Sequence, residues 1–465
     1  MRGIKRQRIG CVGGQSGRIN ERAIDTQWIE YLGSYADVVK IPPIRWIKLM
    51  GGAPDTWPDM SAARLGEAAK GLTELVRAYE LDAIYANLPA LTPYLLAARS
   101  LAGLPTGFLM IAHSVGSEHW LRHWLSITPL LCSRDVVLTA THSAKQALTN
   151  LSPVYEASPV IPLCIRVEED SPVTAAEELG RRRWNDPSFH MLSIGRLEQV
   201  KNIDKQLLML HEVRQHIPSA RLLVAGDYTG TDHTEITAYR LKLESLVHGL
   251  GLEEAVSFTG PVMGEEKEEL FRKADVLINL STDPGETFGF NLIEAKTKGI
   301  PVVCTGWDGI REVVEHEKDG LLISCRWSGD TPVFDYMEAA QQVVRLYQDR
   351  ELARSMSARA QWNAKSYSYK LIMPKVMEAL DRALTTGNPA VLPSARDTEH
   401  LLTRPIGEQP HMYRLSELRA PELLNRNPLT VLRSTRMDRE RWAAAAKPII
   451  HHFPGSYDNV SVYHD

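Results

Sequence analysis

The stretch HMLSIGRLEQVKNIDKQLLMLHEVRQHIPSARLLVAGD, residues 190–227, consists of two short apolar runs on either side of a segment with helical periodicity. The runs at 190–196 and 220–227 have the length of buried strands. The apolar residues between them fall on one helical face: Leu207, Leu208, Leu210, Val213 and Ile217. Pro218 cannot continue a helix, so it marks the end of this segment. A strand, a helix and a second strand in this order predict a βαβ unit with parallel strands.

The alternation of strand-like and helix-like segments occurs twice along the chain. The strand-like runs of the first half are residues 8–14, 82–87, 106–113, 135–141 and 158–163, and those that follow in the second half are residues 255–260, 275–281 and 301–306. Segments with helical periodicity separate them, for example Ala62 to Tyr79. This pattern predicts the α/β class, with two doubly wound, Rossmann-like domains whose strand ends face a central cleft. Ligands of such sheets bind outside the carboxyl ends of the strands, so we expect the site there.

A charged stretch, residues 166–187, separates the two patterns. We therefore expect an N-terminal domain over residues 1–170 and a C-terminal domain over residues 185–365. Residues 386–465 show no such alternation apart from a short helix-like segment at 438–447, and we expect an irregular extension there. Wrapping of the body and homo-oligomerisation through this extension are the alternatives.

The composition narrows the class of protein. A hydrophobic content of 44%, a charged content of 24% and a net charge of -4 are typical of a soluble globular protein and give no reason to expect nucleic acid as a partner. The five cysteines are widely spread without a C-x-x-C pair, which indicates reduced core residues and neither a zinc site nor a disulfide framework. The apolar stretch near the N-terminus is too short for a signal peptide or a membrane span, so we expect a cytoplasmic protein.

Two basic residues follow the strand-like run at 190–196. Arg196 lies just past its end, and Lys201 lies in a loop before the helix that begins near Asp204. A planar guanidinium and a mobile ammonium at the carboxyl end of a strand are suited to a diphosphate. A solvated surface pair without a ligand is the alternative.

Two glutamates in GETFGFNLIEAKTKG, residues 285–299, are candidates for ligand contacts. On one helix Glu286 and Glu294 would be roughly 12 Å apart, farther than the carboxylates of a glycoside hydrolase. The proline and glycine before Glu286 indicate a loop, with a helix that begins near Phe290 or Asn291. We expect Glu294 to accept hydrogen bonds from vicinal hydroxyls, Glu286 to meet another part of an elongated ligand, and the helix start to attract phosphate. Two unrelated surface acids are the alternative.

A glycine-rich turn follows the first strand-like run. Its glycines, at positions 10, 13, 14 and 17, do not fit G-x-G-x-x-G, so a nicotinamide enzyme is not expected. Gly13 and Gly14 would let the backbone approach a ligand closely, beside a helix start that suits an anion. A tight turn without a ligand is the alternative.

HSVGSEHWLRHW, residues 113–124, gathers aromatic residues and histidines. Trp120 and Trp124 are four positions apart, as are His119 and His123. The tryptophans are interpreted either as stacking platforms for an acceptor or as core residues of a helix. No third ligand accompanies the histidines, so we expect no metal site.

Four motifs occur in order between Met191 and Ser324: GRLEQVKN, VSFTGPV, ETFGFNLIEAKTKGIPVV and DGIREVVEHEKDGLLI. This segment resembles the donor-binding half of retaining glycosyltransferases of the GT-B fold, closest to family 4. The first domain is similar more loosely, through its glycine loop and TGFLMIAHSVG, and residues 366–385 resemble a closing helix that returns to the first domain. The resemblance implies transfer of a sugar, expected to be a hexose, from a nucleoside-diphosphate sugar, with retention of configuration and with no metal or other cofactor required.

The resemblance also implies roles for single residues. Arg196 and Lys201 would hold the diphosphate, Glu294 the ribose and Glu286 the donor sugar, while Gly14 would offer its amide to the phosphate. His113 would lie beside the transferred sugar. The implied catalytic residues are Glu286, His113, Arg196 and Lys201. The implied donor-binding residues are Gly13, Gly14, Arg196, Lys201, Glu286, Phe288, Gly289, Phe290, Asn291 and Glu294.

Several alternatives remain open at this point. A front-face mechanism, with the diphosphate stabilised by the two cations, competes with a double displacement in which Glu286 is the nucleophile. A sugar-nucleotide isomerase of the same fold and a non-catalytic nucleotide-sugar binding protein are the other functional interpretations. The partners that we expect are the donor and a hydroxylated acceptor (a sugar, a glycan or a natural-product aglycone), with no membrane association or only a peripheral one.

Overall fold

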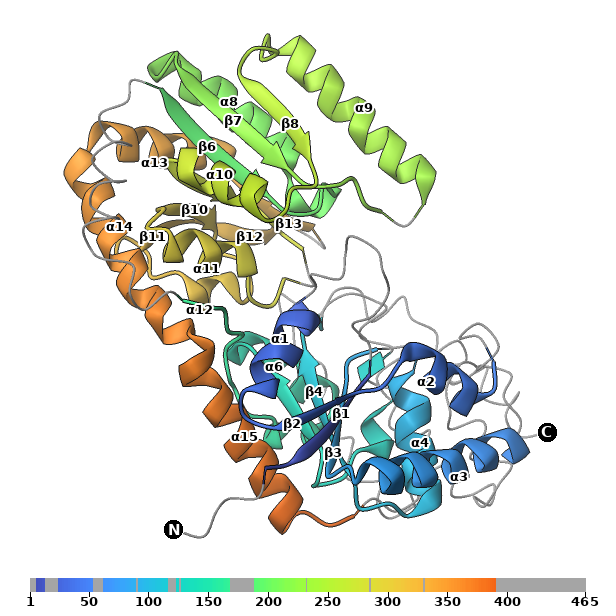
Figure 1. Cartoon of the computed structure of the whole chain (residues 1–465). Helices are drawn as coiled ribbons and strands as arrows, with labels where there is room; N and C mark the ends of the chain where they lie inside the picture. Colours follow the sequence, from blue (N-terminus) through green and yellow to red (C-terminus); the bar gives the residue numbers. More distant parts are fainter. Residues whose placement is uncertain are drawn as a thin grey trace. The chain divides into compact units, whose positions relative to one another are not determined.

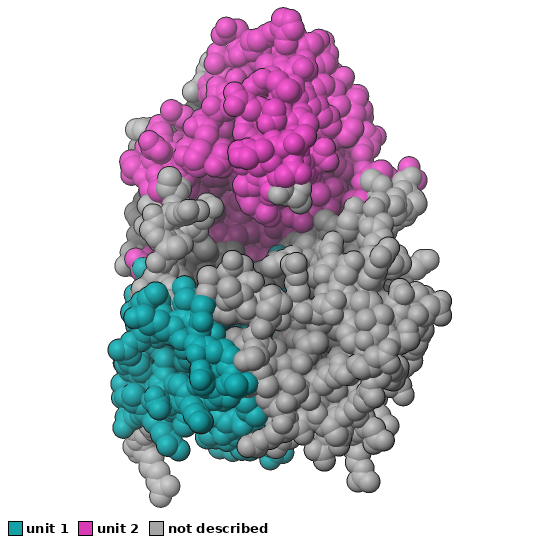
Figure 2. Space-filling view, turned by 90° about the vertical axis from the view of Figure 1, so that its right-hand side faces the viewer, with its two compact units in different colours: residues 1–164, 370–465 teal, residues 165–369 magenta. Residues whose placement is uncertain are grey.

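The structure is a computed structural model that describes residues 6–12, 24–52, 62–88, 91–115, 123–124, 127–167, 188–230, 232–283, 286–328 and 331–389. The chain divides into two compact units, which Figure 2 shows in different colours. Unit 1 comprises residues 1–164 and 370–465, and unit 2 comprises residues 165–369. Residues 168–187 of the expected charged stretch and the helix-like segment at 438–447 lie outside the described residues.

Five parallel strands form the sheet of unit 1, in the order β2-β1-β3-β4-β5 (Figure 1). The strands are β1 (Arg8–Val12), β2 (Asp37–Lys40), β3 (Ala83–Ala86), β4 (Gly107–Ala112) and β5 (Val136–Thr139). The helices are α1 (Ile24–Gly33), α2 (Pro43–Met50), α3 (Ala62–Tyr79), α4 (Thr92–Ala102), α6 (His142–Leu151) and α15 (Tyr369–Thr386). The strand order changes direction between β1 and β3, which makes this the switch point of the first sheet.

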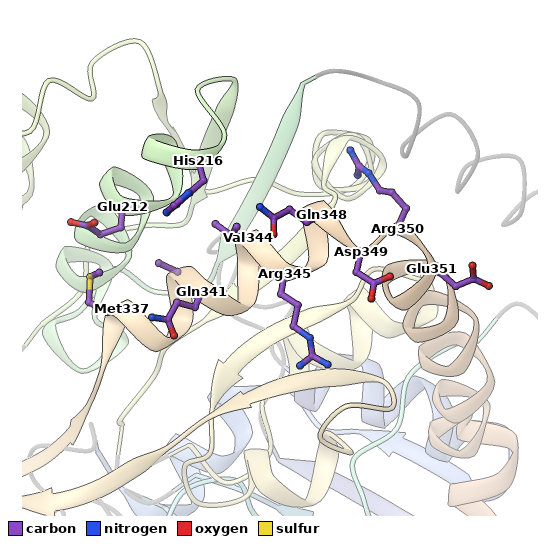
Figure 3. A pocket seen from close by; sticks show the side chains of 11 residues that line it. Glu212, His216, Met337, Gln341, Val344, Arg345, Gln348, Asp349, Arg350 and Glu351 are labelled. Atoms are coloured by element: carbon purple, nitrogen blue, oxygen red, sulfur yellow. The ribbon is translucent and has the colours of Figure 1, made fainter.

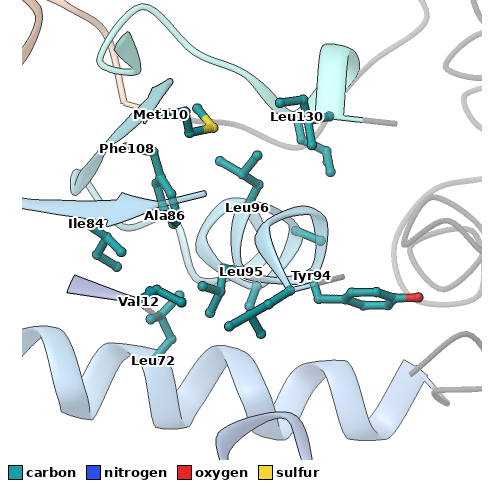
Figure 4. Close-up of a cluster of buried hydrophobic side chains, with 14 of the residues drawn as sticks. Val12, Leu72, Ile84, Ala86, Tyr94, Leu95, Leu96, Phe108, Met110 and Leu130 are labelled. Carbon is teal, nitrogen blue, oxygen red and sulfur yellow. The ribbon is translucent and has the colours of Figure 1, made fainter. Parts of the chain in front are cut away.

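The core of unit 1 lies between its sheet and the helices that cover it. Figure 4 shows Phe108 and Met110 of β4 near Leu95 and Leu96 of α4. Every residue of β3 and β4 is buried, as expected for central strands of a sheet that is covered on both faces, and the edge strand β5 is buried as well. The hydrophobic effect therefore holds this unit together through the packing of these strands against α3 and α4.

A buried ion pair ties the loops of unit 1 together. Arg99 of α4 pairs with Asp135, and both side chains are at most 1% exposed. Asp135 also accepts hydrogen bonds from the amides of Phe108 (2.9 Å) and Cys132 (2.8 Å). The charges are tolerated because each has several hydrogen-bond partners.

Helix α15 belongs to unit 1 although it comes at the far end of the described chain. Gln7 donates a hydrogen bond to Asp381 (2.8 Å), and the hydroxyl of Tyr35 donates to the carbonyl of Lys370 (3.3 Å). The closing helix expected over residues 366–385 corresponds to this element.

Six parallel strands form the main sheet of unit 2, in the order β11-β10-β9-β6-β7-β8. The strands are β6 (Phe189–Ile194), β7 (Ala220–Ala225), β8 (Val256–Gly260), β9 (Val276–Asn279), β10 (Val302–Thr305) and β11 (Gly320–Ile323). The chain runs from β6 outward to β8, returns to β9 on the other side of β6, and then runs outward to β11. The switch point of this sheet therefore lies between β6 and β9.

Helices on both sides of the switch point cover the faces of the second sheet (Figure 1). They are α8 (Ile203–His216), α9 (His233–Gly249), α10 (Glu265–Lys273), α11 (Phe290–Thr297), α12 (Ile310–Val313), α13 (Tyr336–Gln348) and α14 (Arg350–Ala364). Aspartates cap α9, α13 and α14 by accepting hydrogen bonds from first-turn amides. Helix α8 packs on α13, and α11 packs on α14.

Most of the predicted elements are present. All five strand-like runs of the second half contain a strand, and the helix predicted over Ala62 to Tyr79 is α3. In α8, Leu208 is only half-buried and Met209 is fully buried, so the predicted apolar face is slightly rotated.

The strand expected at 158–163 is wrong. Among the described residues this run makes only an isolated bridge between Val160 and Thr139, because two of its six residues are prolines without a backbone donor. The sequence prediction also missed β2, β11 and an antiparallel hairpin of β12 (Cys325–Ser328) and β13 (Thr331–Phe334). In β2 only two apolar residues stand between Asp37 and Lys40, and none of its four residues is fully buried, so it gives no signal of a buried strand.

Candidate functional site

The loops after β6 and β9 meet at the switch point of unit 2. Asn202 donates hydrogen bonds from Nδ2 to the carbonyl of Leu280 (2.8 Å) and to the hydroxyl of Thr282 (2.9 Å). The amide of Thr282 donates in return to the carbonyl of Val200 (2.8 Å). These bonds join the two loops into one surface at the carboxyl edge of the sheet, where ligands of such folds bind.

Lys201 directs its ammonium group at acceptors on the loop after β9. Its Nζ lies 2.5 Å from Glu286 Oε2, 3.0 Å from Asp283 Oδ2 and 3.4 Å from Ser281 Oγ. Burial alone would lower the pKa of Lys201, but the carboxylates of Glu286 and Asp283 outweigh burial and raise it. The lysine is therefore charged at neutral pH, and its three donors face three acceptors.

Arg196 lies beside Lys201 and is more accessible. Its side chain is 59% exposed and pairs with Glu198 (2.7 Å) and, at 3.4 Å, with Asp283. Glu198 also accepts a hydrogen bond from the hydroxyl of Thr229, in the loop after β7. The guanidinium is thus held on one side and open to solvent on the other.

Close packing of the loops after β6 and β7 places Arg196. The amide of Leu197 donates to the carbonyl of Asp227 (2.8 Å). A Cβ at Gly226 would lie 1.7 Å from the carbonyl oxygen of Gly195, so only glycine permits this approach.

Glu286 connects Lys201 to the start of α11. While Oε2 contacts Lys201, Oε1 accepts a hydrogen bond from the amide of Gly289 (3.1 Å). Gly289 has a left-handed φ of 76°, and a Cβ there would lie 2.7 Å from Leu292 Cδ1. Helix α11 begins at the next residue, so its first-turn amides lie close to Glu286 in sequence and carry partial positive charge.

Three further predicted residues surround this start of α11. Phe288 is 3% exposed, and its ring meets that of Tyr367 edge-on with centroids 5.7 Å apart. Asn291 donates to the carbonyl of Ile194 (2.8 Å) and accepts from Asn279 (3.0 Å), which ties the helix to the ends of β6 and β9. Phe290 is half-buried.

Glu294 lies on α11 and pairs with a residue of α10. Its Oε1 is 2.6 Å from Nζ of Lys267, and its side chain is 19% exposed. The predicted residues from Arg196 to Glu294 thus come from two adjacent strand ends and the helix that follows the second.

The remaining predicted residues belong to unit 1 or lie outside the described residues. His113 directly follows β4 and is half-buried. Gly13, Gly14 and Trp120 are not described. Trp124 is fully buried, and its indole donates to the carbonyl of Ser114 (2.9 Å). The burial of Trp124 favours the core interpretation over an acceptor contact.

The sequence interpretation did not single out Asp283, Glu198 or Lys267. Asp283 has the clearest signal, since it follows a buried strand at the carboxyl edge of the sheet. Lys267 stands in a run of charged residues, EEKEE, that looks like an ordinary exposed helix face.

A separate surface pocket of about 760 Å³ lies along α8, α13 and the start of α14 (Figure 3). Its lining includes Glu212, His216, Arg345 and Arg350 and contains none of the predicted site residues. Within the described ranges, no three His, Cys, Asp or Glu side chains are grouped as a metal site. No described helix is both long and apolar enough to cross a membrane.

Comparison with known proteins finds one family model that matches most of unit 2. The family model described as "Glycosyl transferases group 1" matches residues 176–362. D-inositol 3-phosphate glycosyltransferase of Pseudarthrobacter chlorophenolicus is 29% identical over 213 residues, which cover 44% of this chain and 47% of that protein. The chain thus spans about half the length of this curated relative.

Solved structures resemble the chain over a larger share of its length. HepE of Anabaena, in complex with UDP and glucose, has a TM-score of 0.59 at 21% identity and covers 81% of this chain and 99% of its own. Sucrose-phosphate synthase of Thermosynechococcus elongatus has a TM-score of 0.58 at 17% identity and covers 82% of this chain and 100% of its own. These similarities confirm the predicted fold of two Rossmann-like domains, that of GT-B glycosyltransferases.

Proposed function

We propose that this chain, whose residues 176–362 form a glycosyltransferase group 1 domain within a GT-B fold, transfers a hexosyl group from a nucleoside-diphosphate sugar to an acceptor hydroxyl. The observation that carries this proposal is the meeting of Arg196, Lys201 and the start of α11 at the switch point of unit 2. Two cations and a helix N-terminus at one sheet edge suit a diphosphate.

Arg196 and Lys201 would bind the diphosphate in different ways. Arg196 has an exposed guanidinium that offers a planar pair of donors to phosphate oxygens. Lys201 is already surrounded by acceptors, so a phosphate oxygen has to replace one of them. We propose that Asp283 yields, because the carboxylate of Glu286 is also held by the amide of Gly289.

The reaction breaks the bond between the anomeric carbon and a phosphate oxygen, and the electron pair stays on the diphosphate. Arg196, Lys201 and the first amides of α11 would stabilise this charge, without requiring a divalent cation. The acceptor hydroxyl would attack from the face that the phosphate leaves, and a phosphate oxygen would take its proton. This front-face route retains the anomeric configuration.

Glu286 and Glu294 would bind the two sugars of the donor. We propose that Glu286 contacts the transferred hexose and Glu294 the ribose hydroxyls. A double displacement with Glu286 as the nucleophile is the competing route, and trapping of a glycosyl adduct on Glu286 would establish it. From unit 1, we propose Gly13, Gly14 and His113 as further donor contacts, and a cytoplasmic location for the protein.

A binding experiment tests the proposal first. The unfolding temperature of the full chain is measured with UDP, GDP, ADP, CDP and their glucose or mannose conjugates, beginning with UDP because HepE was solved with UDP and glucose. A ligand at 100 times its Kd stabilises the folded state by about 2.7 kcal/mol. A chain that none of these compounds stabilises contradicts the proposal.

Turnover separates the transferase from the alternatives. If the chain is a transferase, mass spectrometry should detect a glycosylated product when an acceptor is present and none when it is left out. Conversion of the donor sugar without any acceptor would instead identify an isomerase, and stabilisation without conversion would identify a binding protein.

A further inference from the structure

Two ion pairs join α10 to α11 and to Lys298, the residue that directly follows α11. Lys267 Nζ lies 2.6 Å from Glu294 Oε1, and Lys298 Nζ lies 2.7 Å from Glu268 Oε2. The first pair is the more enclosed, with Lys267 30% and Glu294 19% exposed, against 39% and 46% for Lys298 and Glu268. Only the first pair includes a residue that we place on the donor.

Lys267 is itself held in place. Its Nζ lies 5.9 Å from the ring centroid of Phe271, one turn further along α10, and Phe271 is 2% exposed. An ammonium near the face of a buried aromatic ring has an additional favourable interaction that limits its motion. The lysine is therefore a localised donor for Glu294.

A fixed carboxylate matters because a ribose presents two adjacent hydroxyls. Both can donate to one carboxylate only if its plane is oriented toward the diol. A glutamate side chain that is free to rotate loses entropy when it is ordered by a ligand. A charge-assisted hydrogen bond to Oε1 orders it in advance and leaves Oε2 and the remaining lone pairs for the hydroxyls.

We propose that Lys267 is a positioning residue that orients Glu294 for the ribose diol and thereby sets the preference of the site for ribonucleotides over 2′-deoxyribonucleotides. This inference rests on the proposed function, in which Glu294 binds the ribose. In this proposal the ion pair of Lys298 and Glu268 only stabilises the structure, because neither residue is placed on the donor.

The test compares the Kd values of UDP and 2′-deoxy-UDP by calorimetry on the full chain; another nucleoside diphosphate replaces UDP if it binds better in the thermal-shift panel. Wild type should bind the ribonucleotide at least about tenfold more tightly, since a hydrogen bond to a charged group contributes about 1.5 to 3 kcal/mol. Lys267→Met, which keeps an unbranched side chain one atom shorter but removes its charge, should weaken UDP severalfold and should weaken 2′-deoxy-UDP, which retains only the 3′-hydroxyl contact, by less. The ratio of the two Kd values should therefore fall, and Lys267→Arg should restore it in part.

The matched control is Lys298→Met, which removes the other of these two ion pairs. It should lower the unfolding temperature by about as much as Lys267→Met and leave the ratio of Kd values at the wild-type level. An unchanged ratio in Lys267→Met, or equal weakening of both nucleotides, overturns the inference. Wild type that binds UDP and 2′-deoxy-UDP equally removes the ribose contact of Glu294 and the inference with it, whereas no binding of any nucleoside diphosphate by wild type is a failure of the proposed function.

Discussion

At the scale of single residues, the site is defined by charges that compensate one another. Arg196 and Lys201 face three carboxylates, those of Glu198, Asp283 and Glu286. Without a ligand, the acids therefore exceed the cations by one charge. An incoming diphosphate has to compete with these internal anions for the same donors, so its affinity depends on how easily one of them gives way.

Replacing Lys201 by alanine should lower kcat by about a hundredfold, because a fixed donor to the leaving group is lost. Steady-state kinetics of Lys201→Ala would measure this, with circular dichroism to show that the fold is kept. The control is Lys205→Ala, which removes a lysine four residues away whose ammonium lies near the ring of Tyr336. Near-normal turnover in Lys201→Ala would remove the diphosphate assignment.

Replacing Asp283 by asparagine should raise the affinity for a nucleoside diphosphate. The change removes the carboxylate that competes for Lys201 and Arg196, so a nucleoside diphosphate should bind roughly fivefold or more tightly, which corresponds to about 1 kcal/mol. Calorimetry with UDP measures the change. Glu317→Gln, which removes an acid paired with Arg345, controls for the altered net charge. Weaker binding of UDP by Asp283→Asn would show that Asp283 supports the phosphate site instead of competing for it.

At the scale of the element, the start of α11 depends on one glycine. Gly289 combines a left-handed φ of 76° with a Cβ position only 2.7 Å from Leu292 Cδ1. The first-turn amides, Asn291 and Glu294 all take their positions from this start and from the pitch of the helix. Three predicted contacts therefore depend on one backbone conformation.

Replacing Gly289 by alanine should lower the free energy of unfolding by about 1 to 2 kcal/mol, the penalty of a left-handed residue with a Cβ, and should also weaken nucleotide binding. Urea denaturation and calorimetry measure the two effects. Gly249→Ala is the control, because Gly249 ends α9 and its added Cβ meets nothing within 4 Å. Unchanged nucleotide affinity in Gly289→Ala would separate the start of α11 from the phosphate site.

At the scale of the whole molecule, each unit has its own parallel sheet with its own switch point. The proposed donor contacts in unit 2 come from loops after β6 and β9, whereas the pocket along α8 and α13 is lined by other residues. Unit 2 therefore has two candidate binding surfaces, and an experiment can tell binding at the switch point from binding in the outer pocket.

Hydrogen exchange with and without a saturating nucleoside diphosphate makes this distinction. We expect slower exchange in peptides that cover residues 195–202 and 281–296, because ligand contacts oppose local opening of these loops. Slower exchange in peptides that cover residues 10–17 would support the proposed contacts of Gly13 and Gly14. Protection confined to α8 and α13 would place the nucleotide in the outer pocket and contradict the site.

The sequence by itself determined the α/β alternation, the two Rossmann-like domains and the positions of Arg196, Lys201, Glu286 and Glu294 at strand ends and on α11. These features are local: hydrophobic periodicity and turn residues act over a few positions, so they can be recognised in one chain. The strands β2 and β11 were not recognised from such a signal. In residues 158–163, the two prolines prevented a strand although the run is apolar.

Only the tertiary structure decided which charges meet. Lys201 and Asp283 are separated by 82 positions, and Lys267 and Glu294 by 27, so no local pattern links them. Burial likewise separated Trp124, a core residue, from the exposed Arg196. Contacts between distant residues follow from the order of strands in the sheet, and that order results from the packing of the whole unit.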